Sequence, residues 1–241
     1  MFPAEKMKPT EKIFRNIDWL GSVWRITTEN PEIQKFKLDV GEPHIAVFPE
    51  ELAYRLIYLY SSVGDCVLDP FCGSGTTNFI ALSLRRKTTG YDIEQKYIDV
   101  SKKRCKGLAT LFCKSSESME EISSNSVQLC ITSPPYLKAK AYSENSENIG
   151  NMNFPYPALK KVFSEVFRAL KPTGYFCLNV ANVAEKGHLK TFPFDMVRLC
   201  NELGFHFRSS IIWDKGLKIK EWNLENNEIA ENHEYIWVFR K

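Results

Sequence analysis

The sequence predicts an α/β fold with a doubly wound, mostly parallel sheet. The chain has 241 residues, 44% of them hydrophobic and 25% charged, which is enough to bury one sizeable core. From residue 49 to about residue 203, helix-like and strand-like patterns alternate, as they do in parallel sheets with crossover helices. The last two strand patterns, FHFRSSIIW and YIWVFR, are joined by a polar loop. We therefore expect them to form an antiparallel pair that closes one side of the sheet.

The elements follow from periodicity and from turn chemistry. Residues 1–41 are polar and irregular, and we expect an extension that Trp19 and Trp24 pack onto the body. Residues 42–241 are expected to form the main domain. Its helices are predicted at 49–62, 73–84, 95–108, 157–170 and 194–203. Its strands are predicted at 66–69, 88–92, 127–132, 174–181, 205–213 and 235–240.

Composition excludes several classes of protein. No run approaches the ~18 apolar residues of a membrane span, and the start MFPAEKMKPTEK lacks the apolar core of a secretion signal. We therefore expect a soluble, cytoplasmic protein without a membrane partner. The seven cysteines are scattered and form no Cys-x-x-Cys pair, which indicates neither a metal site nor a disulfide framework. The net charge of +3 permits a polyanionic partner without requiring one.

A glycine-rich turn follows the first strand of the alternating region. In VLDPFCGSGTT, Asp69 ends a strand, and Gly73 and Gly75 precede hydroxyl residues that can begin a helix. Glycines here let the backbone pass close to a ligand that faces the N–H groups of the helix start. A tight strand-to-helix turn without a ligand is the alternative. Asn78 replaces the third glycine of a dinucleotide fingerprint, so a compact zwitterion is favoured over a strong anion, with Asp69 receiving its ammonium group.

An acidic residue also ends the next strand. Asp92 in YDIEQKY suits a ribose, whose vicinal hydroxyls need acceptors, although a helix N-cap is the plainer alternative. A nucleoside with an amino-acid tail satisfies both this strand end and the glycine turn. S-adenosylmethionine is such a molecule.

Two consecutive prolines stop the strand VQLCIT in the segment CITSPPYLK. Proline has no N–H and holds the preceding residue extended, so Ser133 and Pro134 end the pairing abruptly and free carbonyl oxygens. Together with the Ser133 hydroxyl these oxygens can hold the hydrogens of an exocyclic amine, while Tyr136 offers a face for a stacked base. Presenting a methyl group in line could supply ~7 kcal/mol through proximity alone. A proline-rich turn without chemistry is the alternative.

With these motifs the sequence resembles the amino-group DNA methyltransferases that use S-adenosylmethionine. DPFCGSGTT is similar to their cofactor motif, TSPPY is similar to their catalytic motif, and the likeness extends over about residues 42–241. It implies a Rossmann-like sheet of seven strands with an antiparallel C-terminal strand. The serine form of the catalytic motif is typical of cytosine N4 enzymes, as found in restriction–modification systems. Adenine N6 enzymes more often carry aspartate or asparagine there.

The resemblance assigns roles to most residues of the two motifs and to residues of neighbouring segments. Catalytic roles fall to Ser133, Pro134, Pro135 and Tyr136. Cofactor-binding roles fall to Phe48, Pro49, Asp69, Phe71, Cys72, Gly73, Ser74, Gly75, Thr76, Thr77, Asp92, Ile93 and Ser115. Ser115 stands near where the family often has an acidic residue beside the adenine. The cofactor motif precedes the catalytic motif, the reverse of many cytosine N4 enzymes, which implies a permuted chain with the same sheet.

The expected partner is double-stranded DNA, with the target base flipped out of the stack. Segments of about 137–157 and 214–233 are the candidate target-facing loops, where phosphates would meet Lys138, Lys140, Lys215, Lys218 and Lys220. Ordinary solvated lysines are the alternative for each. A separate specificity subunit and a homodimer both stay open. Other hypotheses are an adenine N6 enzyme, an RNA or protein-amide methyltransferase, and a catalytically silent nucleic-acid-binding subunit. A cytosine C5 enzyme is disfavoured because no Pro-Cys pair occurs.

Overall fold

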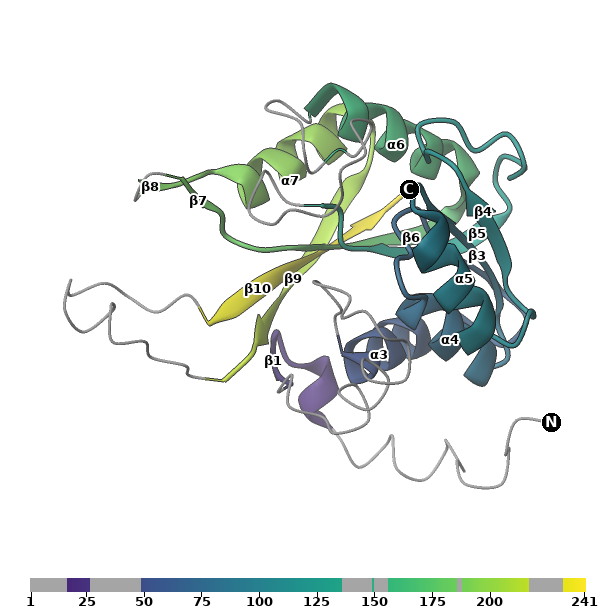
Figure 1. The fold of residues 1–241 in the computed structure, drawn as a ribbon. Coiled ribbons are helices and arrows are strands. Elements are labelled where there is room, and N and C mark those ends of the chain that lie inside the picture. Colours follow the sequence, from purple (N-terminus) through teal and green to yellow (C-terminus); the bar gives the residue numbers. More distant parts are fainter. Residues whose placement is uncertain (1–16, 27–48, 136–148, 150–155, 186–187, 217–231) are drawn as a thin grey trace.

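A single eight-stranded sheet forms the centre of the computed structural model, which describes residues 17–26, 49–135, 149, 156–185, 188–216 and 232–241. The strand order is β1-β9-β10-β6-β5-β2-β3-β4 (Figure 1). The strands are β1 (Val23–Arg25), β2 (Cys66–Asp69), β3 (Lys87–Asp92), β4 (Thr110–Cys113), β5 (Val127–Thr132), β6 (Leu170–Val180), β9 (His206–Asp214) and β10 (His233–Arg240). A separate short hairpin pairs β7 (Ala184–Glu185) with β8 (His188–Leu189). The helices are η2 (Ile17–Leu20), α3 (Glu50–Tyr60), α4 (Thr76–Ser83), α5 (Gln95–Arg104), α6 (Tyr156–Ala169) and α7 (Phe192–Glu202).

The sheet is doubly wound, as predicted. Strand β2 pairs in parallel with β3 on one side and with β5 on the other. The chain builds outward from β2 to β3 and β4, and then returns to add β5 and β6 on the opposite side. This reversal creates a topological switch point between β2 and β5. In α/β sheets, ligands bind in the crevice at the carboxyl ends of the strands that flank such a point.

The C-terminal strands close one side of the sheet. Strand β10 runs antiparallel to both β6 and β9, which confirms the predicted antiparallel pair. The sheet has one strand more than the predicted seven, because β1 pairs in parallel with Ile212–Asp214 of β9. Trp24 of β1 is 1% exposed and anchors this short strand to the core. Neither β1, which has three residues, nor β4, which has four, was predicted from the sequence.

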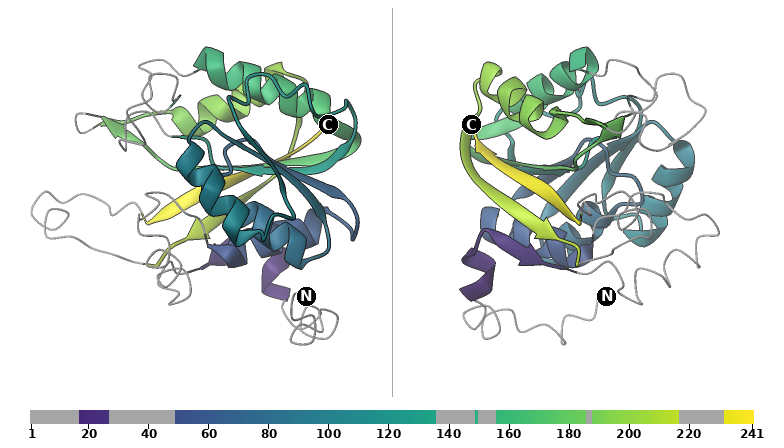
Figure 2. Two further views of the ribbon diagram at one scale, coloured as in Figure 1. Left: turned by 45° about the vertical axis from the view of Figure 1, so that its right-hand side comes forward. Right: turned by 90° about the vertical axis from the view of Figure 1, so that its left-hand side faces the viewer.

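Helices cover both faces of the sheet. Helices α6 and α7 lie on one face, and α3 and α4 lie on the other, with α5 beside α4 (Figure 2). On α6 the buried residues Leu159, Val162, Phe163 and Val166 recur at helical spacing. Burying each such side chain stabilises the fold by about 1.5 to 3 kcal/mol. The two layers leave the carboxyl ends of β2, β3 and β5 at one edge of the sheet.

The described parts of the chain contain neither a membrane-spanning helix nor a cluster of metal-ligating side chains. None of the helices there combines the length and apolar character that crossing a membrane requires. In the same parts, no group of three or more His, Cys, Asp or Glu side chains is placed to share a metal ion. Five of the seven cysteines are buried as free thiols: Cys72, Cys105, Cys130, Cys177 and Cys200.

Candidate active site

The carboxyl ends of β2 and β5 are joined by a buried hydrogen bond. Asp69, the last residue of β2, is 2% exposed. Its Oδ1 accepts hydrogen bonds from the hydroxyl of Thr132 at 2.8 Å and from the N–H of Phe71 at 3.1 Å. Thr132 is the last residue of β5. The glycine turn and the Ser-Pro-Pro segment therefore leave the sheet side by side at the switch point.

The glycine turn spans from the end of β2 to the end of β3. The N–H of Cys72 donates to the carbonyl of Tyr91 at 2.8 Å, and the N–H of Gly73 donates to Asp92 Oδ2 at 3.0 Å. Gly73 has a φ of 48°, and Gly75, which caps α4, has a φ of 78°. Backbone in this left-handed region favours glycine because it has no Cβ. The turn thus fixes the Asp92 carboxylate, and neither glycine has a side chain of its own to cover the turn.

Helix α5 supports the glycine turn from behind. A Cβ at Gly75 would lie 2.1 Å from Ser101 Oγ, so α5 packs directly on this backbone. Arg104, whose side chain is 6% exposed, donates from Nη1 to Thr76 Oγ1 at 2.9 Å and from Nη2 to Glu50. Arg104 therefore links the starts of α4 and α3. This bracing holds the turn in place before any ligand binds.

The two strand-end carboxylates have unusual titration properties. Burial raises the pKa of Asp69 to about 6, although the hydrogen bonds from Thr132 and Phe71 oppose the shift. Burial also raises the pKa of Asp92 to about 6, with N–H donors from Glu94 and Gly73 acting in the opposite direction and the charge of Asp69 adding to the rise. Backbone N–H groups and a hydroxyl hold these carboxylates. Such a pair favours a ligand that brings positive charge or hydroxyl donors.

The proline pair ends β5 as the sequence predicted. The register of β5 with β6 runs to Thr132 opposite Leu178 and stops there. Pro134 is buried, and Ser133 and Pro135 are half-buried. The Ser133 hydroxyl oxygen accepts a hydrogen bond from Asn179 Nδ2 at 3.2 Å. Ser133 is thus held one residue beyond the Thr132–Asp69 bond, past the carboxyl end of β5.

Most of the other residues predicted to bind the cofactor around the glycine turn have buried side chains. Cys72, Ser74, Thr76 and Thr77 are all buried, and the Thr76 hydroxyl is bonded to Arg104. Phe71 is half-buried against the apolar cluster under α6 and α7. Contacts of these side chains with a cofactor stay predictions.

Three further predicted cofactor residues occupy neighbouring loops. Pro49 is buried, precedes α3 and accepts the first N–H bonds of that helix through its carbonyl. Ile93 follows Asp92 and is half-buried. Ser115 lies two residues after Cys113, which is the register partner of Asp92. Its Oγ accepts a hydrogen bond from the N–H of Glu117 at 3.2 Å. Ile93 and Ser115 follow the carboxyl ends of β3 and β4, and the predicted roles of all three residues stay predictions.

Lys215 is engaged within the protein. Its Nζ lies 3.0 Å from Glu234 Oε1 and 5.9 Å from the ring centroid of Trp213. A contact between Lys215 and a phosphate therefore stays a prediction. The remaining predicted site residues lie outside the described residues: Phe48, Tyr136, Lys138, Lys140, Lys218 and Lys220.

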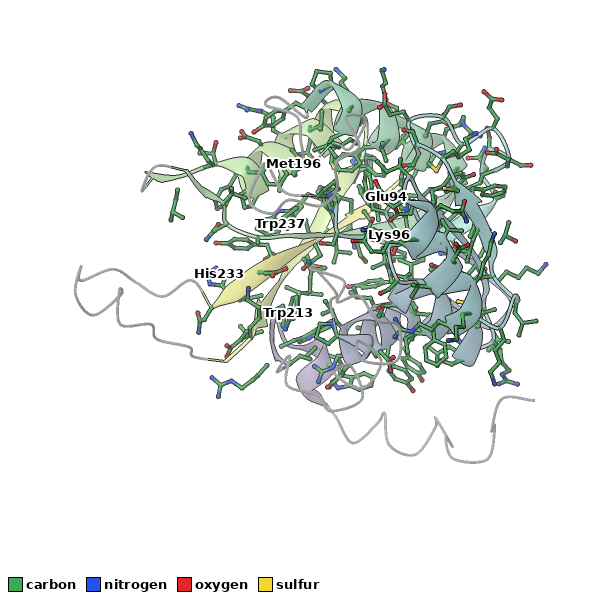
Figure 3. The ribbon with its side chains drawn as sticks, in the orientation of Figure 1. Glu94, Lys96, Met196, Trp213, His233 and Trp237 are labelled. Carbon is green, nitrogen blue, oxygen red and sulfur yellow. The ribbon has the colours of Figure 1, made fainter. Side chains whose placement is uncertain are left out.

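Two residues outside the predicted set of site residues are further functional candidates. Glu94 precedes α5 beside Asp92, and its buried Oε1 has no hydrogen-bond partner within the described structure (Figure 3). Its spacing of two residues from Asp92 was a usable signal. Arg104 is the other candidate, and no local signal marks it, because its partner Glu50 is 54 residues away in the sequence.

The fold is that of S-adenosylmethionine-dependent methyltransferases. A crystal structure of a TehB-like enzyme of this kind from Corynebacterium glutamicum aligns with a TM-score of 0.55 at 15% identity, covering 87% of this chain and 95% of that one. The family model for DNA methylases of the N6 and N4 type matches residues 3–103 and 127–241. The chain belongs to this DNA methylase family.

Individual relatives match over shorter segments. The type II methyltransferase M.MjaI of Methanocaldococcus jannaschii is 40% identical over 77 residues, which are 32% of this chain and 24% of that protein. The DNA adenine methyltransferase YhdJ of Escherichia coli is 38% identical over 84 residues, which are 35% of this chain and 27% of that protein. The matched segments thus span about a quarter of the curated relatives' length.

Proposed function

We propose that the protein transfers a methyl group from S-adenosylmethionine to an exocyclic amino group in double-stranded DNA, as part of a restriction–modification system in the cytoplasm. The carrying observation is the Thr132–Asp69 bond, which brings the glycine turn and the Ser-Pro-Pro segment together at the switch point. Membership in the DNA methylase family supports the same activity.

The residues at the crevice suit the cofactor. S-adenosylmethionine supplies an activated methyl group, and it carries an ammonium group and a ribose with two hydroxyls. Asp69 is a buried carboxylate and Asp92 a half-buried one at neighbouring strand ends, and Glu94 adds a buried acceptor oxygen that no described group satisfies. A ligand that donates to these oxygens would relieve their desolvation. We infer that Asp92 and Glu94 receive the ribose hydroxyls, and that Asp69 favours the positively charged end.

The Ser-Pro-Pro segment is proposed to hold the target amine. An exocyclic amine on a base has its lone pair delocalised into the ring and is a poor nucleophile in that state. The Ser133 hydroxyl and the carbonyl oxygens freed by Pro134 and Pro135 are acceptors for its two hydrogens. Holding the amine this way turns its lone pair toward the glycine turn. The nitrogen becomes acidic once it carries the new methyl group, so this proposal requires no dedicated base.

We propose cytosine N4 as the target position. The serine at position 133 supports this assignment through the family resemblance. Adenine N6 is the second candidate, because the relative YhdJ is named as a DNA adenine methyltransferase. The two candidates differ in the base, and they share the cofactor and the crevice.

Product analysis tests the proposal. The protein is incubated with methyl-labelled S-adenosylmethionine and with duplex DNA, tRNA or protein, and methylated DNA is digested to nucleosides and identified by mass. We expect label only in duplex DNA, as N4-methylcytosine. N6-methyladenine would select the second candidate. Label in tRNA or protein would refute DNA as the substrate, and absence of cofactor binding in calorimetry would favour a catalytically silent subunit.

A further inference from the structure

A chain of side-chain bonds runs from Ser133 across four adjacent strands. Asn179 on β6 donates from Nδ2 both to Ser133 Oγ at 3.2 Å and to Glu234 Oε2 at 2.8 Å. The other oxygen of Glu234, on β10, accepts from Lys215 Nζ at 3.0 Å. Lys215 directly follows β9 and lies over the ring of Trp213. The predicted catalytic serine is therefore connected to the C-terminal strand pair.

The register of the sheet explains why these side chains meet. Asn179 lies opposite Ile236 on β10, so Glu234, two residues earlier, is its diagonal neighbour on the same face. Glu234 in turn lies opposite Trp213 on β9. Figure 3 labels Trp213 on β9 and His233 on β10, the two paired strands that carry this part of the chain of bonds. The connection therefore depends on the rigid sheet for its geometry.

The chemistry of the chain fixes the direction of each hydrogen bond. A carboxylate only accepts, so the Asn179 amide must turn its NH₂ group toward Glu234. One hydrogen of that group then points at Glu234 and the other at Ser133 Oγ. Asn179 is 3% exposed, and the side chain of Glu234 is 15% exposed, so water competes little for these bonds. The Asn179 amide thereby holds the Ser133 oxygen from the side of β6.

We propose that Glu234 is a positioning residue for methyl transfer. It fixes the Asn179 amide, and through this amide it orients the Ser133 hydroxyl toward the target amine. Lys215 holds Glu234 in place, which is a role different from a phosphate contact. This inference rests on the proposed function and extends it to a carboxylate 101 positions beyond Ser133 in the sequence. Glu234 and Lys215 touch neither substrate nor cofactor in this role.

A double-mutant cycle tests the proposal. Single-turnover methyl transfer is measured for E234A, N179A and the double variant at saturating DNA and cofactor. We expect E234A to slow transfer about 10- to 100-fold, the scale of a displaced catalytic group, with unchanged affinity for S-adenosylmethionine. The double variant should be no slower than N179A, within about twofold, because Glu234 acts only through Asn179. Additive losses would overturn the proposal.

Conservative and distant variants separate positioning from a general effect on folding. E234Q keeps an oxygen for Asn179 and should recover part of the rate that E234L loses. E202A removes an exposed carboxylate at the end of α7 and should leave the rate unchanged. Equal losses in E234Q and E234L would overturn the proposal, because retaining the acceptor would then make no difference.

A second readout does not depend on activity. In nitrogen-15-labelled protein, the Asn179 NH₂ signals are assigned by their loss in N179A. We expect slow hydrogen exchange in the wild type and about tenfold faster exchange in E234A, since one hydrogen bond contributes on the order of 1 kcal/mol. Unchanged exchange would overturn the linkage. If the wild type methylates no DNA, the proposed function fails while this measurement still decides the linkage.

Lys215 has its own test. A phosphate contact predicts that K215M reduces the slope of log affinity for DNA against log salt by about 1. The positioning role predicts an unchanged slope and a slower single-turnover rate. A reduced slope with an unchanged rate would overturn the assignment of Lys215.

Discussion

Replacing Gly75 with alanine should damage the cofactor turn more than its size suggests. Gly75 has a φ of +78°, and a Cβ there would lie 2.1 Å from Ser101 Oγ and 2.9 Å from Ser101 Cβ. Left-handed backbone costs an alanine about 1 to 2 kcal/mol. Forcing a methyl group into packed structure costs a further ~1 to 3 kcal/mol. We therefore expect G75A to lower the free energy of unfolding by about 2 to 5 kcal/mol.

A matched control separates the two contributions. Gly107 has a φ of +71°, and a Cβ there would meet nothing within 4 Å. G107A should therefore lose only the backbone contribution of about 1 to 2 kcal/mol. Replacing Ser101 by glycine removes the Oγ and Cβ that collide, so G75A/S101G should regain part of the stability relative to S101G alone.

Urea denaturation measures stability, and calorimetry measures the affinity for S-adenosylmethionine. We expect G75A to weaken cofactor binding while G107A binds like the wild type, because only Gly75 belongs to the turn. Equal losses of stability in G75A and G107A would refute the packing argument. Full cofactor affinity in a folded G75A protein would refute the role of this turn in binding.

Three other predictions concern the same crevice. Because burial raises the pKa of Asp69 and of Asp92 to about 6, affinity for S-adenosylmethionine should rise from pH 5 to pH 7 and then level off. The free energy of unfolding of the protein without cofactor should fall as the pH rises, because the folded state binds these two protons more tightly than the unfolded state does. This stabilising contribution is fully present below pH ~4 and is lost as the pH rises through about 6. Calorimetry and urea denaturation at each pH check both trends, and flat profiles would contradict them. E94Q should weaken cofactor binding by about tenfold with little change in stability, since a hydrogen bond to a charged acceptor contributes at least about 1.5 kcal/mol; unchanged affinity would remove Glu94 from the site. R104M should lower the free energy of unfolding by about 3 kcal/mol because it leaves Glu50 without its cation. K103M replaces an exposed neighbouring lysine and should change the free energy of unfolding by no more than about 0.5 kcal/mol. Equal effects of the two substitutions in urea denaturation would contradict the bracing role.

Local patterns were sufficient to predict the main strands and helices and both loops of the site. Asp69 and the glycines that follow it lie in one continuous segment, as do Thr132, Ser133 and the prolines. Their meeting could be predicted because the carboxyl ends of parallel strands gather at one edge of a sheet. The observed bond between Thr132 and Asp69 agrees with that expectation.

Contacts between residues far apart in sequence could not be predicted. Ser101 defines the space at Gly75, but nothing near either residue indicates the contact. The absent third glycine is a similar case: Asn78 is fully buried on α4 and bonds Thr88, and Gly90 of β3 provides the close approach instead. Packing between elements decides these positions, and the local pattern of a single sequence carries no record of it.

Charge alone also gave little guidance about partners. Lys215 was a candidate for phosphate binding by composition and position, yet the structure holds its ammonium against Glu234. A lysine in a polar loop has several available partners, and only the three-dimensional register of β9 and β10 shows which carboxylate is near.

A structure of the protein crystallised with S-adenosylhomocysteine tests the central claim most directly. The account predicts the ribose hydroxyls at Asp92 and Glu94, and the sulfur in the crevice between the glycine turn and Ser133. The space left beside the sulfur should admit an amine nitrogen about 3 to 3.5 Å from a transferable methyl carbon. A ligand bound elsewhere, or a sulfur that faces away from Ser133, would contradict the account.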